Sequence, residues 1–298
     1  MGSYFSYLAF RLGVFLLALL PFRVMYGLSD LLAFVLRDVL RYRREVAEEN
    51  VRRCFPDKSE GERRALLRAS YRNLSDVLLE GLKGLSMGKE ELLRRYRFVN
   101  PDLPEALYEQ GVPVLSAQAH YGNWEWGVSS FSLQVPQTVV GIYKPLKHPL
   151  IGAFTDARRK RYGLVLRDLR QTRAAMKEFG ESPSLFIMIA DQSPSNPFKS
   201  HWLSFFGCET AWLHGTDYWA RRLKCPVLFM DVQRVKRGFY EIRFSLLADA
   251  SRKEFEEGEI TRLYVRKLEE MIRQKPADWL WTHRRWKLSR PQDVKLLG

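Results

Sequence analysis

The amino-terminal part of the chain is dominated by apolar positions. Residues 4–20 contain a single charge, Arg11, and after Pro21 a second apolar stretch covers residues 24–36. A bilayer-spanning helix needs about 20 apolar residues, so the pattern fits a short or tilted span, two helices lying in the membrane interface, or a buried helical hairpin. The segment has no cleavage site of the kind that ends a removable signal peptide. We expect residues 1–40 to form a hydrophobic, membrane-anchoring helical segment.

Beyond this segment, helical and strand-like patterns alternate. Apolar residues recur at three- and four-residue steps over residues 45–84, which predicts helical structure interrupted at Pro56. Runs of β-branched and aromatic residues predict strands over residues 112–116, 138–143, 164–166, 185–190, 227–235 and 240–246. Helical patterns lie between them, over residues 124–133, 150–162, 172–179, 213–223 and 259–274. The alternation predicts one α/β domain over residues 41–298, with a mixed, largely parallel central sheet flanked by helices.

A polar cluster follows the strand predicted over residues 112–116. The sequence VPVLSAQAHYGNWEW places His120 at the end of the apolar run and Glu125 in the first turns of the next helix. Open α/β sheets bind their ligands at such strand ends. A neutral imidazole can act as a general base, and a nearby carboxylate can orient it and stabilise the imidazolium. The same two residues could equally form a structural hydrogen-bonded pair.

A second strand ends in a polar pair. The apolar run of residues 185–190 continues directly into Asp191 and Gln192. If the two strands run parallel, these side chains lie at the same edge of the sheet as His120. Asp191 could then bind a substrate hydroxyl or a basic partner, with Gln192 shaping the pocket. Alternatively, the Asp191 side chain only closes a turn.

Charge and composition narrow the set of partners. The formal net charge of +14 predicts attraction to nucleic acid, anionic lipid head groups, phosphorylated saccharides or an acidic carrier protein. Aromatic residues are abundant, with 8 Trp, 13 Tyr and 18 Phe, and Trp and Tyr favour membrane interfaces. The 3 Cys and 5 His lack the spacing of a disulfide framework or a zinc site. We therefore expect no metal.

Two arginine-rich segments are candidates for binding phosphate, which guanidinium groups can grip with two hydrogen bonds. Residues 158–161 end a predicted helix, where cations also complement the helix dipole. The C-terminal PADWLWTHRRWK, residues 276–287, interleaves tryptophans with cations. Taken alone, this tail also fits a nucleic-acid surface, with rings that stack on bases.

These segments together resemble the lipid A biosynthesis acyltransferase family, the late lauroyl and myristoyl transferases. His120, Gly122, Asn123, Trp124 and Glu125 match the His-x-Gly-Asn-Trp-Glu block of that family. The tail resembles its Trp-x-x-x-His-Arg-Arg-Trp-Lys signature, and the Asp-Gln pair after the second strand is also similar. The resemblance covers nearly the whole chain and implies a glycerolipid-acyltransferase-like fold.

The resemblance also implies roles for individual residues. His120 and Glu125 would be catalytic, with Glu125 orienting His120. The substrate-binding residues would be Asn123, Arg159, Asp191 and Gln192, and the residues near phosphate would be Arg158, Arg284 and Arg285.

The implied reaction is acyl transfer from acyl-carrier protein to a hydroxyl of a Kdo-bearing lipid A precursor, without a cofactor. The catalytic domain would face the cytoplasm at the inner membrane and would bind no nucleic acid. Ser193 and the segment 208–213 depart from the family pattern, which leaves donor length and acceptor position open. Two alternatives remain at this stage: a related transferase acting on a lysophospholipid or a phosphoinositol mannoside, and a basic, membrane-attached binding protein.

Overall fold

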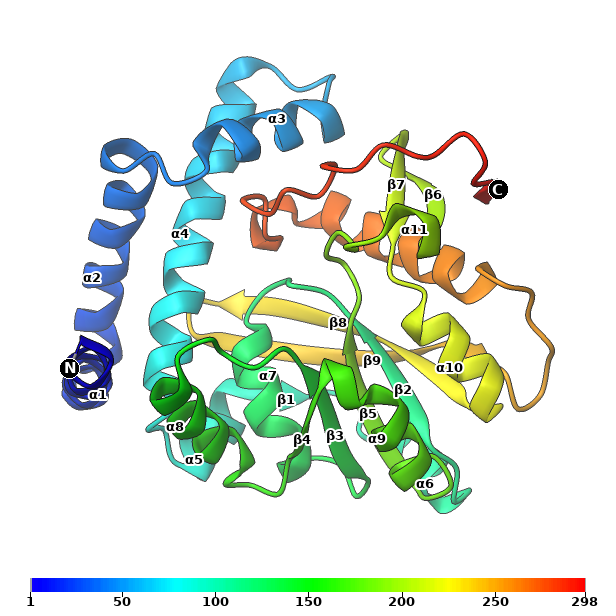
Figure 1. Ribbon diagram of the computed structural model, residues 1–298. Coiled ribbons are helices and arrows are strands. Elements are labelled where there is room, and N and C mark those ends of the chain that lie inside the picture. The colour runs from blue at the N-terminus through cyan, green and yellow to red at the C-terminus, as the bar shows by residue number, and fades with distance from the viewer. Residues whose placement is uncertain (1, 298) are drawn as a thin grey trace.

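The computed structural model describes residues 2–297, which fold around one large central sheet (Figure 1). Its strands are β1 (Tyr96–Phe98), β2 (Val114–Gln118), β3 (Thr138–Tyr143), β4 (Val165–Asp168), β5 (Ser184–Ile189), β8 (Pro226–Lys236) and β9 (Phe239–Asp249). They are ordered β1-β9-β8-β2-β5-β3-β4. The neighbours β8 and β9 run antiparallel, whereas the other neighbouring pairs of this sheet run parallel. The predicted α/β class with a mixed, largely parallel sheet is confirmed.

Helices cover both faces of this sheet. The α-helices are α1 (Gly2–Leu19), α2 (Phe22–Phe34), α3 (Arg44–Cys54), α4 (Glu60–Gly84), α5 (Lys89–Arg95), α6 (Asp102–Glu109), α7 (Trp124–Ser130), α8 (Pro149–Lys160), α9 (Thr172–Phe179), α10 (Gly215–Leu223) and α11 (Glu259–Gln274). Shorter helical turns are η1 (Val35–Val39), η2 (Phe131–Leu133), η3 (Leu169–Gln171), η4 (Pro197–Lys199) and η5 (Pro276–Asp278).

The central strands are apolar on both sides because each side faces its own core. In β5, Phe186 packs in the cluster that includes Leu268 of α11, whereas Leu185 packs in the cluster that includes Trp126 of α7. Strands buried on both faces have continuous apolar runs instead of alternating ones. This burial explains why β5 was visible in the sequence as an apolar run, and why Ser116 and Gln118 of β2 are buried as well.

A small second sheet lies beside the large one. It consists of β6 (His201–Phe205), β7 (Cys208–Trp212) and β10 (Leu296–Leu297), ordered β10-β6-β7. β6 and β7 form a hairpin whose turn residues Phe206 and Gly207 both have positive φ, 50° and 75°. This conformation suits the right-handed twist of a tight hairpin. The sequence pattern did not predict this sheet.

The amino-terminal helices α1 and α2 lie at a large angle to each other (Figure 1), and each packs on the rest of the fold. α2 lies along α4 and buries Met25, Ser29 and Ala33 there (Figure 1). The last carbonyl groups of α1 are hydrogen-bonded by one side chain of α4: Lys83 Nζ donates to the carbonyls of Leu17, Ala18 and Leu20. The ends of helices leave such carbonyls without partners inside the helix. Lys83 therefore fixes the end of α1 to α4.

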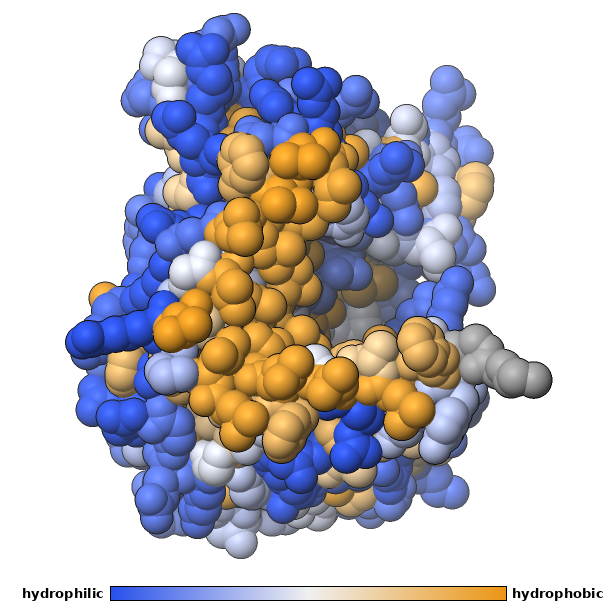
Figure 2. Space-filling view, turned by 90° about the vertical axis from the view of Figure 1, so that its left-hand side faces the viewer, coloured by the Kyte–Doolittle hydropathy of each residue, from blue (hydrophilic) through white to orange (hydrophobic). Residues whose placement is uncertain are grey.

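The outer sides of these two helices are apolar and exposed. Their exposed large apolar residues are Tyr4, Phe5, Leu8, Leu12, Phe15, Leu16 and Leu19 of α1 and Val24, Leu28, Leu31 and Phe34 of α2. Figure 2 shows the resulting continuous patch, beside which the face of the molecule is hollowed. Across residues 2–297, however, no helix combines the length and the apolar character needed to cross a bilayer. The sequence left open whether the apolar segment spans the membrane, lies in its interface or forms a buried hairpin; the structure gives it the form of two angled helices, and membrane anchoring stays a prediction.

Candidate active site

The two polar strand ends predicted from the sequence lie next to each other. β2 and β5 are parallel neighbours, with Gln118 opposite Ile189. The chains leaving these strands therefore place His120 and Asp191 at the same edge of the sheet. This arrangement is the one that a shared ligand site requires.

Asp191 is the carboxylate that holds the His120 ring. The ring Nδ1 lies 2.7 Å from Asp191 Oδ1, and the backbone N–H of His120 donates to Asp191 Oδ2 over 2.9 Å. Trp279 Nε1 donates to the same Oδ2 over 3.0 Å. Asp191 is only 2% exposed. These contacts fix the Nδ1–H tautomer and leave Nε2 of His120 free to accept a proton.

The electrostatics of this pair favour a charged imidazole. Burial opposes charge on His120, but the negative charge and the hydrogen bond of Asp191 outweigh it and raise the pKa of His120 above its usual value of 6.5. Burial likewise opposes charge on Asp191, and the His120 charge together with the hydrogen bonds lowers the pKa of Asp191. Both directions are those of a pair that is stabilised as an ion pair.

The second nitrogen of His120 faces the open side of the site. Its side chain is 18% exposed, and Gln192 Nε2 lies 3.1 Å from His120 Nε2. The ring of Trp124 lies edge-on, with 5.1 Å between the ring centroids. A substrate hydroxyl that displaced the Gln192 amide would meet an acceptor nitrogen held in place by a buried carboxylate.

Glu125 and Arg159 form a separate ion pair beside His120. Arg159 Nη2 lies 2.8 Å from Glu125 Oε2, and the two side chains are 19% and 33% exposed, respectively. Glu125 was expected to orient His120, but the hydrogen bond to the ring comes from Asp191, because the carboxylate of Glu125 is turned to Arg159. The negative charge of Glu125 still contributes to the raised pKa of His120.

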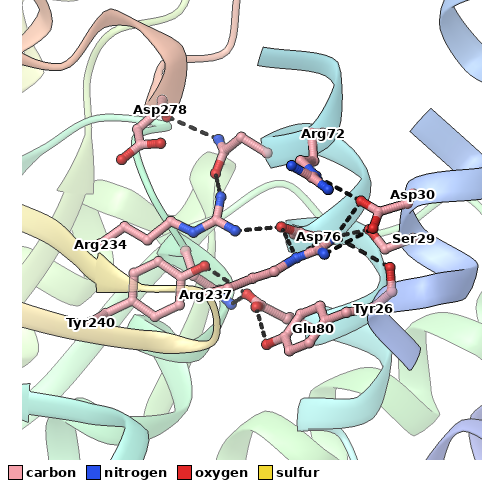
Figure 3. A network of polar contacts seen from close by, with 12 residues as sticks. Tyr26, Ser29, Asp30, Arg72, Asp76, Glu80, Arg234, Arg237, Tyr240 and Asp278 are labelled. Atoms are coloured by element: carbon pink, nitrogen blue, oxygen red, sulfur yellow. Dashed lines mark hydrogen bonds and ion pairs between the residues drawn. The ribbon is translucent and has the colours of Figure 1, made fainter. Parts of the chain in front are cut away.

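Asn123 lies in the interior and not on the substrate side. Its side chain is 0% exposed; its Oδ1 accepts from the backbone N–H of Trp126, and its Nδ2 donates to Glu80 Oε2 over 2.6 Å. The first bond caps α7, and the second joins the motif to a buried polar network that links α2, α4, β8 and β9 (Figure 3). The expected substrate contact is therefore corrected to a structural one, because both ends of the amide are bonded inside the protein.

The arginines expected near phosphate have different surroundings. Arg158 donates from Nε to the carbonyl of Leu85 and so connects α8 to the end of α4. Arg285 is 1% exposed, its guanidinium lies 4.1 Å from the centroid of the Trp212 ring, and burial lowers its pKa to about 10. The buried position of Arg285 does not suit a phosphate of a substrate, whereas Arg158 is partly exposed and its phosphate contact stays a prediction. Arg284, in contrast, is exposed and lines a surface cavity.

The C-terminal motif contributes residues that the sequence analysis did not assign to the site. Besides Trp279, His283 contacts the segment that follows β5: its Nε2 accepts from the backbone N–H of Ser193 over 3.0 Å. Burial lowers the pKa of His283 to about 4, which suits this acceptor role. The tryptophan and histidine spacing of the tail was the available signal, but it did not reveal that the tail reaches the ends of β2 and β5.

Gly122 gives the motif its sharp turn. Its φ is +57°, and a Cβ at this position would lie 3.1 Å from Val232 Cγ1. Both the backbone conformation and the close approach favour glycine. The turn lets Tyr121 pair with Trp279 through an isolated β-bridge, which brings the tail to Asp191. Within residues 2–297, no group of three or more His, Cys, Asp or Glu side chains is arranged to hold a metal ion.

Comparison with known proteins confirms the resemblance drawn from the motifs. The family described as "Bacterial lipid A biosynthesis acyltransferase" matches residues 2–288. The lipid A biosynthesis lauroyltransferase of Escherichia coli (strain K12) is 23% identical over 282 residues, which cover 94% of this chain and 90% of the relative. The lipid A biosynthesis palmitoleoyltransferase of the same organism is also 23% identical, with 93% of this chain and 90% of the relative covered. A lipid A biosynthesis acyltransferase of Haemophilus influenzae is 21% identical over 93% of this chain and 86% of its own length.

Proposed function

The chain belongs to the bacterial lipid A biosynthesis acyltransferase family, and from this premise we propose that it transfers a fatty acyl chain from acyl-carrier protein to a hydroxyl of a lipid A precursor. Membership makes the protein an acyltransferase of lipid A synthesis. The donor, the hydroxyl and the residue roles are our proposal. The observation that carries it is the hydrogen-bonded pair of His120 and Asp191 at the ends of two parallel strands.

In the proposed reaction, His120 acts as a general base. Its Nε2 takes the proton of the acceptor hydroxyl while the hydroxyl oxygen attacks the thioester carbonyl carbon. The carbon–sulfur bond then breaks, the ester forms, and the departing thiolate takes the proton from the imidazolium. Such proton transfer typically contributes about 10²–10⁴-fold to the rate. Asp191 stabilises the imidazolium in between, in the way that a triad carboxylate does.

We assign the ion pair of Glu125 and Arg159 to the substrate side of the same reaction. The Glu125 charge adds to the field that stabilises the imidazolium. Arg159 is largely buried, and its pKa is raised because the Glu125 charge and hydrogen bond outweigh burial. A cation held in this way can stabilise the negative charge that develops on the carbonyl oxygen. Gln192, which contacts His120 Nε2, would mark the position of the acceptor hydroxyl.

We further propose that the enzyme works at the inner membrane, on its cytoplasmic face, with helices α1 and α2 lying in the interface. On the side turned away from the core, α2 exposes Leu28 and Leu31, which continue the exposed apolar side of α1 (Figure 2). A large contiguous apolar patch on a protein surface marks a contact with a membrane or a partner. A bilayer is the apolar phase that would cover this outer side without a spanning helix. The net charge of +14 favours both an anionic membrane surface and an anionic donor and acceptor.

The test is an acyl-transfer assay with the purified full-length enzyme in mixed micelles. Labelled acyl-carrier protein and acyl-coenzyme A are compared as donors, and a lipid A precursor is compared with a lysophospholipid and a phosphoinositol mannoside as acceptors. We expect product with acyl-carrier protein and the lipid A precursor, in an ester linkage. Transfer only to another acceptor would overturn the proposed substrate while leaving the enzyme class intact.

A further inference from the structure

A group of four arginines lines one cavity on the surface, although they come from opposite ends of the chain. Arg41, Arg43 and Arg44 lie between η1 and the first turn of α3, and Arg284 lies in the C-terminal segment. The cavity has a volume of about 600 Å³ and also contains Glu45 and Glu48 in its lining. Four positive and two negative side chains give this lining a formal charge of +2.

The two segments are held together by specific contacts. Asn50 of α3 donates from Nδ2 to the carbonyls of Trp281 and His283, over 2.8 Å and 2.9 Å. Arg43 Nη1 donates to the carbonyl of Thr282 over 3.2 Å. Arg284 is therefore positioned opposite the other arginines by buried and partly buried hydrogen bonds, so the cavity is part of the fold.

The turn that presents these arginines is strained. Arg41 and Arg43 have φ values of 49° and 51°, a left-handed conformation that non-glycine residues rarely adopt. Such conformations persist where the surroundings require them and are frequent at functional sites. Arg44 is paired with Glu48, with 2.8 Å between Nε and Oε1. Arg41 and Arg284 are exposed, and no ion pair engages either of them within residues 2–297, so their donors are available to an anion.

The segments that line the cavity continue on one side into exposed apolar residues and on the other side into the contact with the segment that follows β5. On one side, Val39 and Leu40 are 61% and 65% exposed and precede Arg41 directly in the chain. On the other side, His283 precedes Arg284 and accepts a hydrogen bond from Ser193, two residues after Asp191. An anion in this cavity would thus sit beside the proposed membrane surface, on a segment that contacts the loop carrying Asp191 and Gln192.

We propose that this arginine cavity binds a phosphate group of the phosphorylated glycolipid that accepts the acyl chain. The inference rests on the proposed function for the identity of the ligand, and on the cavity for its chemistry. A concave, arginine-lined site suits a phosphosugar, since guanidinium groups bind phosphate oxygens bidentately. An acidic protein surface would be convex and would not require neighbouring exposed leucine and valine.

The experiment measures binding apart from catalysis. Titration calorimetry on the full-length protein compares N-acetylglucosamine 1-phosphate, inorganic phosphate and N-acetylglucosamine as probes. The variant R41Q/R284Q removes the two exposed cations, and R173Q, an exposed arginine of α9 outside the cavity, is the matched control. We expect the double variant to lose about a hundredfold in affinity for the phosphosugar, in line with the loss of two charged hydrogen bonds, and the control to bind as wild type. A third variant, E45Q, removes a negative charge from the lining and should tighten binding by about threefold.

A second measurement separates a lipid head group from free phosphate. Phosphatidylcholine vesicles carrying diphosphoryl or monophosphoryl lipid A are compared for binding of wild type and R41Q/R284Q. A preference of the wild type for the diphosphoryl vesicles that the double variant lacks supports the proposal. Equal binding by both proteins overturns it, as does binding of inorganic phosphate that the variants do not weaken. These readouts do not depend on turnover. If the wild-type enzyme transferred no acyl chain but bound the phosphosugar through Arg41 and Arg284, the proposed function would be refuted and the cavity assignment would stand.

Discussion

Asp191 and Asp76 are both buried carboxylates surrounded by donors, but they face different cations. Asp76, 0% exposed, accepts from Ser29 and is paired with Arg234 and Arg237 (Figure 3). Arg234 and Arg237 stay protonated, because their acidic neighbours outweigh the effect of burial and raise the pKa of both guanidinium groups. Asp191 faces His120, whose charge changes near neutral pH. The Asp76 cluster therefore holds fixed charges, whereas the Asp191 pair can gain and lose a proton.

The two clusters also differ in what surrounds them. The cluster around Asp76 joins α2 and α4 to β8 and β9, and it continues through Glu80, which accepts from Tyr26, Tyr240 and Asn123. Burial raises the pKa of Glu80 although these hydrogen bonds oppose the rise. The His120 side chain, in contrast, keeps one nitrogen on the open side. Burial and hydrogen bonds hold the side chains rigidly in both the Asp76 cluster and the His120–Asp191 pair. Only the second has a partner that can exchange a proton and that is open to a substrate.

The largest effect is expected from His120→Asn. The asparagine amide can still donate to Asp191, but it cannot take a proton, so we expect acyl transfer to fall by about 10³-fold. At a pH above the pKa of His120, where the imidazole is neutral and no charge is lost, the unfolding free energy should change by less than about 1 kcal/mol, because the buried carboxylate keeps a donor. Initial rates and urea unfolding curves of the same preparation test both parts. A variant that retained more than a tenth of wild-type activity would contradict the general-base role.

Asp76→Asn should have the opposite profile. It leaves the largely buried Arg234 without this counter-charge and Arg237 with only the partly exposed Asp30, which should lower the unfolding free energy by about 3 kcal/mol, with little change in the rate per folded molecule. The urea midpoint measures the loss. Asp30→Asn is the matched control, because the Asp30 side chain is 39% exposed and such a pair contributes less than about 1 kcal/mol. If Asp76→Asn and Asp30→Asn lowered the unfolding free energy equally, burial of the carboxylate would not explain the stability of the Asp76 cluster.

The pH profile distinguishes the two carboxylates further. Neutral His120 is the proposed base and Asp191 raises its pKa, so kcat/KM should rise with pH through a pKa above 6.5. In Asp191→Asn the charge that favours the imidazolium is gone, and this acidic limb should move to lower pH while the plateau falls. Measurement of kcat/KM between about pH 5 and pH 9 tests the direction. The exposed Glu178→Gln should leave the limb in place.

The smallest effect concerns the apolar outer side of α1. Replacing both Leu12 and Phe15, each 58% exposed, by serine should weaken binding to phospholipid vesicles by about thirtyfold, because each apolar side chain that enters the interface contributes roughly 1 kcal/mol. Vesicle flotation measures the change. Leu169→Ser is the control, since Leu169 is 59% exposed but lies on η3. An equal loss in the control would show that α1 has no special part in vesicle binding.

The sequence predicted the parts of the fold whose patterns are local. The strand over residues 138–143 and the helices over 172–179 and 259–274 coincide with β3, α9 and α11, because their periodicity is uninterrupted and their ends carry clear signals. β1 and β10 are only 3 and 2 residues long, too short for any periodicity. Their position depends on parallel pairing with strands far away in the chain.

The site was predictable as a set of motifs but not as a set of contacts. His120 and Asp191 were placed at one edge of the sheet from strand patterns alone, and the parallel register of β2 and β5 agrees. Which carboxylate faces the imidazole depends on the direction of the side chains, which the sequence does not show. Glu125, from the same motif as His120, is turned to Arg159, whereas Asp191 follows a different strand and bonds to the ring. The contacts of Trp279 and of Asn123 with these groups likewise arise from tertiary packing.

The ammonium group of Lys83 has a consequence for how the enzyme can be handled. It is 7% exposed, and its acceptors are the carbonyls at the end of α1. A shortened chain that begins after Pro21 would remove the three carbonyl acceptors of this cation and would expose the apolar side of α4 behind it to water. A fragment that lacks α1 should therefore precipitate or unfold. Purification of the intact polypeptide in detergent is the better way to obtain active protein.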